Sequence, residues 1–132
     1  MPRVGDWLTL DELRARIRER KLDLADEGLT ALPPEIGQLT SLFALRLDGN
    51  QLTALPPEIG QLSNLHELAL DNNQLTALPP EVGELTNLRT LRLNGNQLTA
   101  LPPEIGSLTA LRMLQLNGMV EEVANDVEGG AL

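Results

Sequence analysis

The chain has no cysteine and no tyrosine, and only one tryptophan and one phenylalanine among its 132 residues. Without cysteine there is neither a disulfide nor a thiolate nucleophile. No run approaches the roughly 18 apolar residues that a membrane span requires. The N-terminus, MPRVGDWLTLDELRARIRER, lacks an apolar stretch of signal-peptide length. These absences predict a soluble protein, without a membrane segment, whose core is built from leucine rather than from large rings.

Signatures of catalysis are also missing. The sequence contains no G-x-x-x-x-G-K-[ST], no G-x-S-x-G and no His/Cys cluster. Its single histidine, His66, has no partners for a triad. We therefore predict that the chain is not an enzyme, has no catalytic residues and carries no cofactor.

What the sequence has is a repeat. The pattern L-x-L-x-x-N-Q-L-T-A-L-P-P-E-[IV]-G-x-L-x-x-L-x-x occupies residues 45–67, 68–90 and 91–113. A looser copy precedes it at 22–44, and a truncated copy follows from Leu114. A constant period between 20 and 50 residues is typical of a solenoid, in which each coil buries its apolar rim against its neighbours.

One repeat unit predicts the shape of one coil. Leu45 and Leu47 alternate with polar residues, as in a short strand. Pro56 and Pro57 cannot continue a ladder, and the following residues, 58–62, predict a helical or 3₁₀ turn. Stacking aligns the leucines in columns and places an asparagine column inside the turn, where the amides can satisfy unpaired backbone groups. We predict that this column is structural: Asn50, Asn73 and Asn96.

A second column holds a glutamate after each proline pair: Glu35, Glu58, Glu81 and Glu104. A row of carboxylates raises the question of a metal site. Successive coils lie about 5 Å apart, and one such column rarely supplies the six to eight oxygens that calcium takes. We predict that no metal is bound.

The pattern L-x-x-L-x-L-x-x-N-x-L, followed by L-P-P-E-I-G-x-L, resembles the leucine-rich repeat family over roughly residues 21–118. Its P-P-E-I-G variant is most similar to the intracellular Ras-group type and to the repeats of Roco GTPases. The resemblance implies an α/β solenoid that binds proteins, with a short-stranded parallel sheet on its concave face and 3₁₀ or short helical turns on its convex face. Extracellular relatives usually carry cysteine-bonded caps, so the lack of cysteine favours the cytoplasm.

The two ends depart from the repeat. Residues 1–21 are expected to form an N-terminal capping segment, with Trp7 and Leu8 folded over the first coil and a helix at about 10–20. Thr9 and Glu12 form a capping box at its start. The repeats, about 4.5 units, span 22–118. Residues 119–132 are either a cap or a frayed tail, and their valines recur at helical spacing: Val120, Val123 and Val127.

The net charge of −9 opposes general binding to phosphate backbones, so we expect no nucleic acid partner. Half of the ten basic residues lie at positions 14–21. There they form either a solvated outer face of the helix or a contact for an acidic partner or RNA. A monomer is expected, with end-to-end pairing as the alternative.

Comparison of the units shows that variation concentrates in five columns around the strand, one of which is Gly49/Asn72/Gly95/Gly118. These columns either form a protein-binding face or vary because they face solvent. From them we predict a partner-binding site on the concave face: Phe43, Arg46, Asp48, His66, Glu67, Asp71, Arg89, Arg92, Asn94, Arg112 and Met113. The predicted function is a non-catalytic protein–protein interaction module. The alternatives are a structural or designed repeat scaffold, or a regulatory repeat segment of a larger signalling enzyme.

Overall fold

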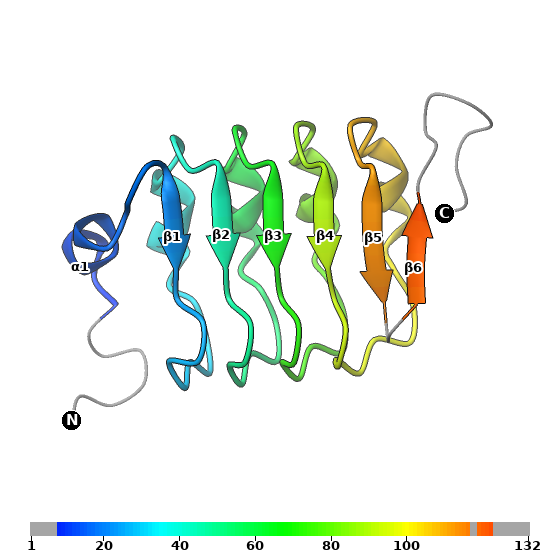
Figure 1. Ribbon diagram of the computed structural model, residues 1–132, viewed down its shortest axis with the longest axis horizontal. Helices are drawn as coiled ribbons and strands as arrows, with labels where there is room; N and C mark the ends of the chain where they lie inside the picture. Colours follow the sequence, from blue (N-terminus) through cyan, green and yellow to red (C-terminus); the bar gives the residue numbers. More distant parts are fainter. Residues whose placement is uncertain (1–7, 117–118, 123–132) are drawn as a thin grey trace.

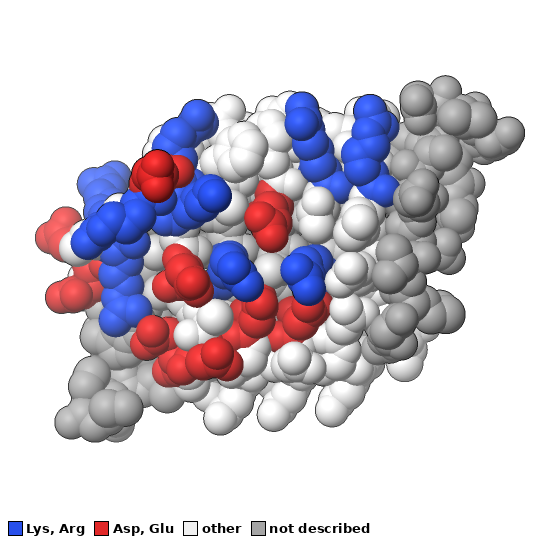
Figure 2. Space-filling model, in the orientation of Figure 1, with Lys and Arg blue, Asp and Glu red and all other residues white. Residues whose placement is uncertain are grey.

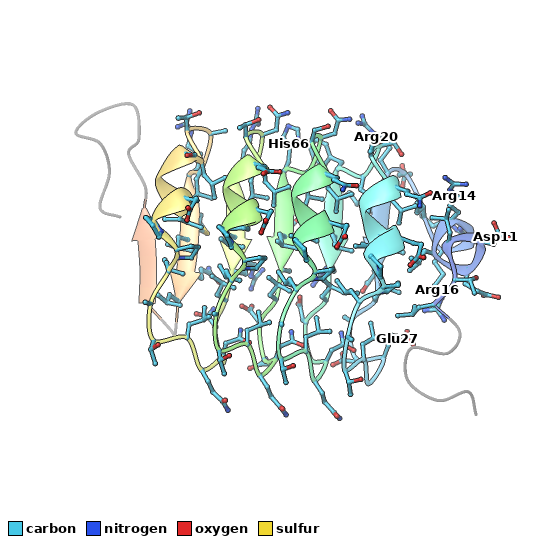
Figure 3. All side chains as sticks on the ribbon, turned by 180° about the vertical axis from the view of Figure 1, so that it is seen from behind. Asp11, Arg14, Arg16, Arg20, Glu27 and His66 are labelled. Atoms are coloured by element: carbon cyan, nitrogen blue, oxygen red, sulfur yellow. The ribbon has the colours of Figure 1, made fainter. Side chains whose placement is uncertain are left out.

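The computed structural model describes residues 8–116 and 119–122, the last four through their backbone. Figure 1 shows one sheet whose strands lie side by side in chain order, with helix α1 (Leu10–Ala15) at the end nearest β1. Short helical turns are stacked behind the sheet (Figure 3). Each coil of the chain therefore contributes one strand in front and one turn behind.

The six-stranded sheet follows the order β1-β2-β3-β4-β5-β6. Its strands are β1 (Lys21–Asp23), β2 (Ala44–Arg46), β3 (Glu67–Ala69), β4 (Thr90–Arg92), β5 (Met113–Leu116) and β6 (Met119–Glu122). The first five are parallel, and their register aligns Leu22, Leu45, Leu68, Leu91 and Leu114. This register is the 23-residue period of the sequence, so the predicted solenoid fold is confirmed.

The turns behind the sheet are 3₁₀ helices, which is one of the two forms that the sequence predicted, a helical turn or a 3₁₀ turn. They are η1 (Pro34–Gln38), η2 (Pro57–Gln61), η3 (Pro80–Glu84) and η4 (Pro103–Ser107). The first proline of each pair is extended, and the second begins the turn. Proline suits that position because its fixed φ starts a helical turn and its missing N–H would have no partner there.

A continuous leucine core fills the space between sheet and turns. The framework leucines and the Ile36, Ile59, Val82 and Ile105 column are buried across the coils. Each buried side chain of this size contributes about 1.5–3 kcal/mol relative to exposure. Because one coil has a single apolar rim, this burial exists only between stacked neighbours.

The asparagine column joins each coil to the one before it. Asn73 Nδ2 donates to the carbonyls of Leu47 and Leu70 at 2.9 and 3.0 Å, and its Oδ1 accepts from Leu52 N at 3.1 Å. Asn50 and Asn96 make equivalent bonds. The predicted structural role of these residues is confirmed.

Glu27 replaces asparagine in the first coil, where no earlier coil offers a carbonyl to the amide. Its carboxylate instead lies 3.1 Å from Arg16 Nη1 of the capping segment (Figure 3). The departure from the repeat pattern therefore marks a contact between cap and first coil.

Helix α1 is shorter than the predicted 10–20. Thr9 Oγ1 accepts from Glu12 N at 3.1 Å, so the helix starts as expected, but it ends at Ala15. The N–H groups of Arg16 and Ile17 donate to the carbonyls of the residues three positions earlier, as in a 3₁₀ turn, and these bonds end the helix. Glu19 and Arg20 then take positive φ angles of 54° and 65°. This reversal is needed to enter β1, and a longer helix would prevent it.

The apolar stripe of the capping segment packs on the open end of the core. Leu8 and Leu13 are buried, and Leu10 and Ile17 pack against the core partly buried. Trp7 lies outside the described residues. Covering the terminal coil in this way shields an apolar rim that would otherwise face water.

Residues 119–132, expected to form a cap or a frayed tail with valines at helical spacing, do not begin as a helix. Residues 119–122 form β6, which pairs antiparallel with β5, bringing Leu116 opposite Met119. The edge of β5 needs partners for its backbone groups, and β-branched valine favours a strand. Val123 and Val127 lie outside the described residues.

Candidate functional site

The open face of the sheet carries its side chains in rows, because parallel strands in register place equivalent residues side by side. We define three rows on this face. The edge row, one residue before each strand, is Arg20, Phe43, His66, Arg89 and Arg112. The middle row is Asp23, Arg46, Ala69, Arg92 and Gln115. The acidic row, just beyond β2–β4, is Asp48, Asp71 and Asn94.

The edge row is held by backbone hydrogen bonds between successive coils. The N–H groups of Phe43, His66, Arg89 and Arg112 each donate to the carbonyl of the preceding row member at 2.7–2.8 Å. The rings of Phe43 and His66 stack with centroids 4.1 Å apart and planes inclined by 16°. His66 Nδ1 lies 2.7 Å from the Asn64 carbonyl, so that nitrogen carries the proton. Figure 2 shows arginines along this edge of the face.

The middle-row arginines lean toward the acidic row. Arg46 Nη2 lies 3.5 Å from Asp48 Oδ2, and Arg92 Nε lies 3.3 Å from Asp71 Oδ2. The second contact is an ion pair whose geometry is not that of a hydrogen bond. Of the four arginines in the predicted site, Arg46 and Arg92 therefore reach the acidic row, whereas Arg89 and Arg112 belong to the edge row.

Asp71 is the most deeply placed of the charged residues on the face, with 8% of its surface exposed. Besides Arg92, its Oδ1 accepts from Asn94 N at 2.8 Å. Asn94 Nδ2 in turn donates to Gln115 Oε1 at 3.0 Å. These contacts give Asp71, Arg92 and Asn94 a role in holding adjacent coils together, which leaves less of them available to a partner.

Between the edge row and the middle row lie the first residues of the strands, including Glu67 and Met113. Phe43 and Met113 are the exposed large hydrophobic residues of the described part of the chain, at 38% and 37%. All eleven predicted site residues thus fall on one face. Sequence reasoning missed Arg20, although it lies 23 residues before Phe43, because the first unit was taken to begin at Leu22.

Away from the open face, the described part of the chain has a hollow beside the capping segment. A cleft of about 380 Å³ between α1 and η1 is lined by Arg14, Ile17, Gln38, Leu39, Thr40 and Ser41. This lining holds hydroxyl groups but no carboxylate or imidazole to act as a base. Among residues 8–116, whose side chains the structure describes, no three from His, Cys, Asp or Glu are placed to hold a metal ion. Nor does that part of the chain contain a helix with the length and hydropathy of a membrane span.

Comparisons with known proteins agree with this geometry. A family model described as leucine rich repeat matches residues 63–118. An LRR protein of Leptospira interrogans has a similar solved structure, with a TM-score of 0.56 and 40% sequence identity. The match covers 80% of this chain and 34% of the other, so the chain spans about a third of that protein's length. A comparison with curated proteins gave no match.

The fold and these matches define the class: the chain is a leucine-rich-repeat solenoid. Domains of this class generally mediate protein–protein interaction. The closer resemblance to Ras-group and Roco repeats stays a prediction. Because 145 chains of solved structures match, the fold is widely shared, and the function of this chain must be argued from its own surface.

Proposed function

We propose that the chain is a non-catalytic module that binds a partner protein through the open, concave face of its sheet. The observation that carries this proposal is the position of Phe43 and Met113. These two exposed large hydrophobic residues both lie on that face, among arginines. Aromatic residues, methionine and arginine are enriched at protein interfaces and often carry much of the binding energy.

The face is also well prepared for binding. Its strands are fixed by the inter-coil hydrogen bonds and by the asparagine column behind them. A surface that is already ordered loses little conformational entropy when a partner docks. We infer a cytoplasmic monomer as the working form, since the chain lacks cysteine and its N-terminal coil is covered by α1.

The proposal is tested by affinity capture from the source lysate with three baits. One is the wild type, one carries Phe43→Ser and Met113→Ser, and the control carries Gln61→Ser and Glu84→Ser in the turns behind the sheet. Quantitative mass spectrometry compares the captured proteins, and circular dichroism verifies that all three baits fold.

A protein retained by the wild type and the control, but lost from the sheet-face variant, supports the proposal. Equal retention by all three baits would move the binding site off the sheet face. Capture of nothing by any bait would favour the scaffold alternative.

A further inference from the structure

Building on the proposed function, we propose that the edge row is the docking site for an extended acidic segment of the partner. In this segment an aromatic residue stands between two acidic ones, in the order acidic-x-aromatic-x-acidic. The row supplies Arg20 at one end, the Phe43–His66 stack in the middle, and Arg89 with Arg112 at the other end.

The positive ends of the row stand out against the rest of the chain. The protein has a net charge of −9, yet three of the five row members are arginines. Arg20 is held in place by its Nε, which donates to the Ser41 carbonyl at 2.9 Å. Arg20 and His66 lie at the same edge of the molecule, whereas Arg16 lies on the cap, farther from that edge (Figure 3). Such a row attracts carboxylates, and guanidinium groups pair with them bidentately.

The centre of the row suits an aromatic group better than a charged one. Phe43 is 38% exposed and stacked on His66, so a third ring can extend the aromatic surface. The strand position next to His66 is Glu67, half-buried, whose carboxylate disfavours an anion at the centre. The acidic residues of the partner are therefore expected at the two ends.

The spacing of the row fixes the spacing of the motif. Neighbouring coils in a parallel sheet lie about 4.8 Å apart, so Arg20 and Arg89, three coils apart, are separated by about 14 Å. An extended chain rises about 3.3 Å per residue, so side chains four residues apart are about 13 Å apart and lie on the same side. The residue halfway between them then lies over the stack of Phe43 and His66.

Arginines beside stacked rings also fit single-stranded nucleic acid. The remainder of the face argues for protein instead, because the acidic row and Asp23 place carboxylates on the same surface. A polyanion crossing the face would meet them, whereas a short acidic segment confined to the edge row would not.

The test is a titration of the ¹⁵N-labelled full chain with the peptide Gly-Glu-Ser-Phe-Ser-Glu-Gly, followed by NMR. We expect saturable shifts of the Phe43, His66 and Arg89 amides, with a Kd on the order of 1 mM or tighter. Arg20→Glu and Arg89→Glu should each weaken binding about fivefold or more, while Arg16→Glu, which changes the net charge equally on the cap, should change it less than about twofold.

Two further peptides test the motif itself. The peptide with lysine in place of glutamate should not bind, and the compressed peptide Gly-Ser-Glu-Phe-Glu-Ser-Gly should bind more weakly. Shifts that are absent, that lie elsewhere, or that are equal for the lysine peptide would overturn the inference. So would tighter binding of a ten-nucleotide oligothymidine to the same amides.

The two proposals fail separately. If the peptide does not bind but Phe43→Ser with Met113→Ser still loses a captured protein, the acidic-segment inference is wrong and the binding face stands. If the sheet-face variant loses nothing and the peptide does not bind, both are wrong.

Discussion

The rings of Phe43 and His66 stack at a centroid distance of 4.1 Å although 23 residues separate them in the chain. The solenoid register produces this contact, because His66 N–H donates to the Phe43 carbonyl at 2.8 Å and places the two side chains side by side. The stack is the only pair of aromatic rings in contact within the described residues. It joins two coils at the surface rather than in the core.

A double-mutant cycle measures the energy of this stack. Phe43→Ala, His66→Ala and the double variant should show a coupling of about 0.5–1 kcal/mol in urea unfolding, because stacked rings interact beyond their buried area. Additive losses would contradict a stabilising stack. Asn87→Ala serves as the control, since Asn87 is exposed and its side chain donates to the Ser63 carbonyl rather than to either ring.

The two middle-row arginines are expected to differ in their effect on stability. Arg92→Ala removes the ion-pair partner of buried Asp71 and should cost about 1–2 kcal/mol. Arg46→Ala removes the longer, more exposed pair with Asp48 and should cost about 0–0.5 kcal/mol. Urea unfolding of both variants measures the two losses of folding stability. Equal losses would show that the Arg92–Asp71 pair stabilises the fold no more than the Arg46–Asp48 pair.

The glycines of the 3₁₀ turns offer a matched pair. A Cβ on Gly83 would lie 2.5 Å from the backbone oxygen of Glu104 in the next coil, whereas a Cβ on Gly106 has no described atom within 4 Å. Gly83→Ala should therefore destabilise by about 1–3 kcal/mol. Gly106→Ala should be neutral or stabilise by up to about 1 kcal/mol, since alanine lowers the entropy of the unfolded chain.

Thermal and urea unfolding of the two glycine variants provide the check. A large loss for Gly106→Ala would mean that another part of the chain packs against η4. A negligible loss for Gly83→Ala would mean that the coils separate easily at this position.

Alanine substitution in the asparagine column should lower the free energy of unfolding far more than alanine substitution of a surface asparagine. Asn73→Ala leaves the Leu47 and Leu70 carbonyls and the Leu52 amide without their side-chain partner, at a cost of about 3 kcal/mol or more. Asn64→Ala loses one exposed bond to the Thr40 carbonyl and should cost less than about 1 kcal/mol. Similar unfolding midpoints for the two variants would contradict the role of the column.

The fold could be predicted from the sequence because the same pattern of framework residues is repeated in every coil. Framework positions such as Leu45, Asn50 and Pro57 recur at a constant interval, so each coil predicts its neighbours. At the ends there is no repetition to support a prediction. The length of α1 depends on the reversal at Glu19 and Arg20, and β6 depends on the edge left by β5.

A fourth set of equivalent positions, in the turn after each strand, differs between coils because of packing: Asp26, Gly49, Asn72 and Gly95. Gly49 and Gly95 have φ near +72° and +71°, and a Cβ on either would meet Oδ1 of the preceding member, Asp26 or Asn72. A side chain in one coil therefore occupies the space that glycine leaves open in the next. The alternation of Asp26, Gly49, Asn72 and Gly95 is packing, although comparison of the units placed Gly49, Asn72 and Gly95 in a variable surface column.

The candidate site followed from the sequence only in part. The columns that vary between units, taken with the family resemblance, predicted the face residues, and the strand register places all eleven on the open face. The 23-residue register already separates Arg46 and Arg92 from Arg89 and Arg112. The ion pairs of Arg46 with Asp48 and of Arg92 with Asp71 were not predictable, because they depend on how far each side chain reaches across the rows. Arg46 and Arg92 reach the acidic row, whereas Arg89 and Arg112 belong to the edge row.

Photo-cross-linking tests the central claim, binding through the sheet face, most directly. A photoreactive phenylalanine is placed singly at Thr90 or Met113 on the face, and at Gln61 or Glu84 in the turns behind. The account predicts that a captured partner cross-links from the first two positions and not from the last two. Cross-links from Gln61 or Glu84 alone would contradict it.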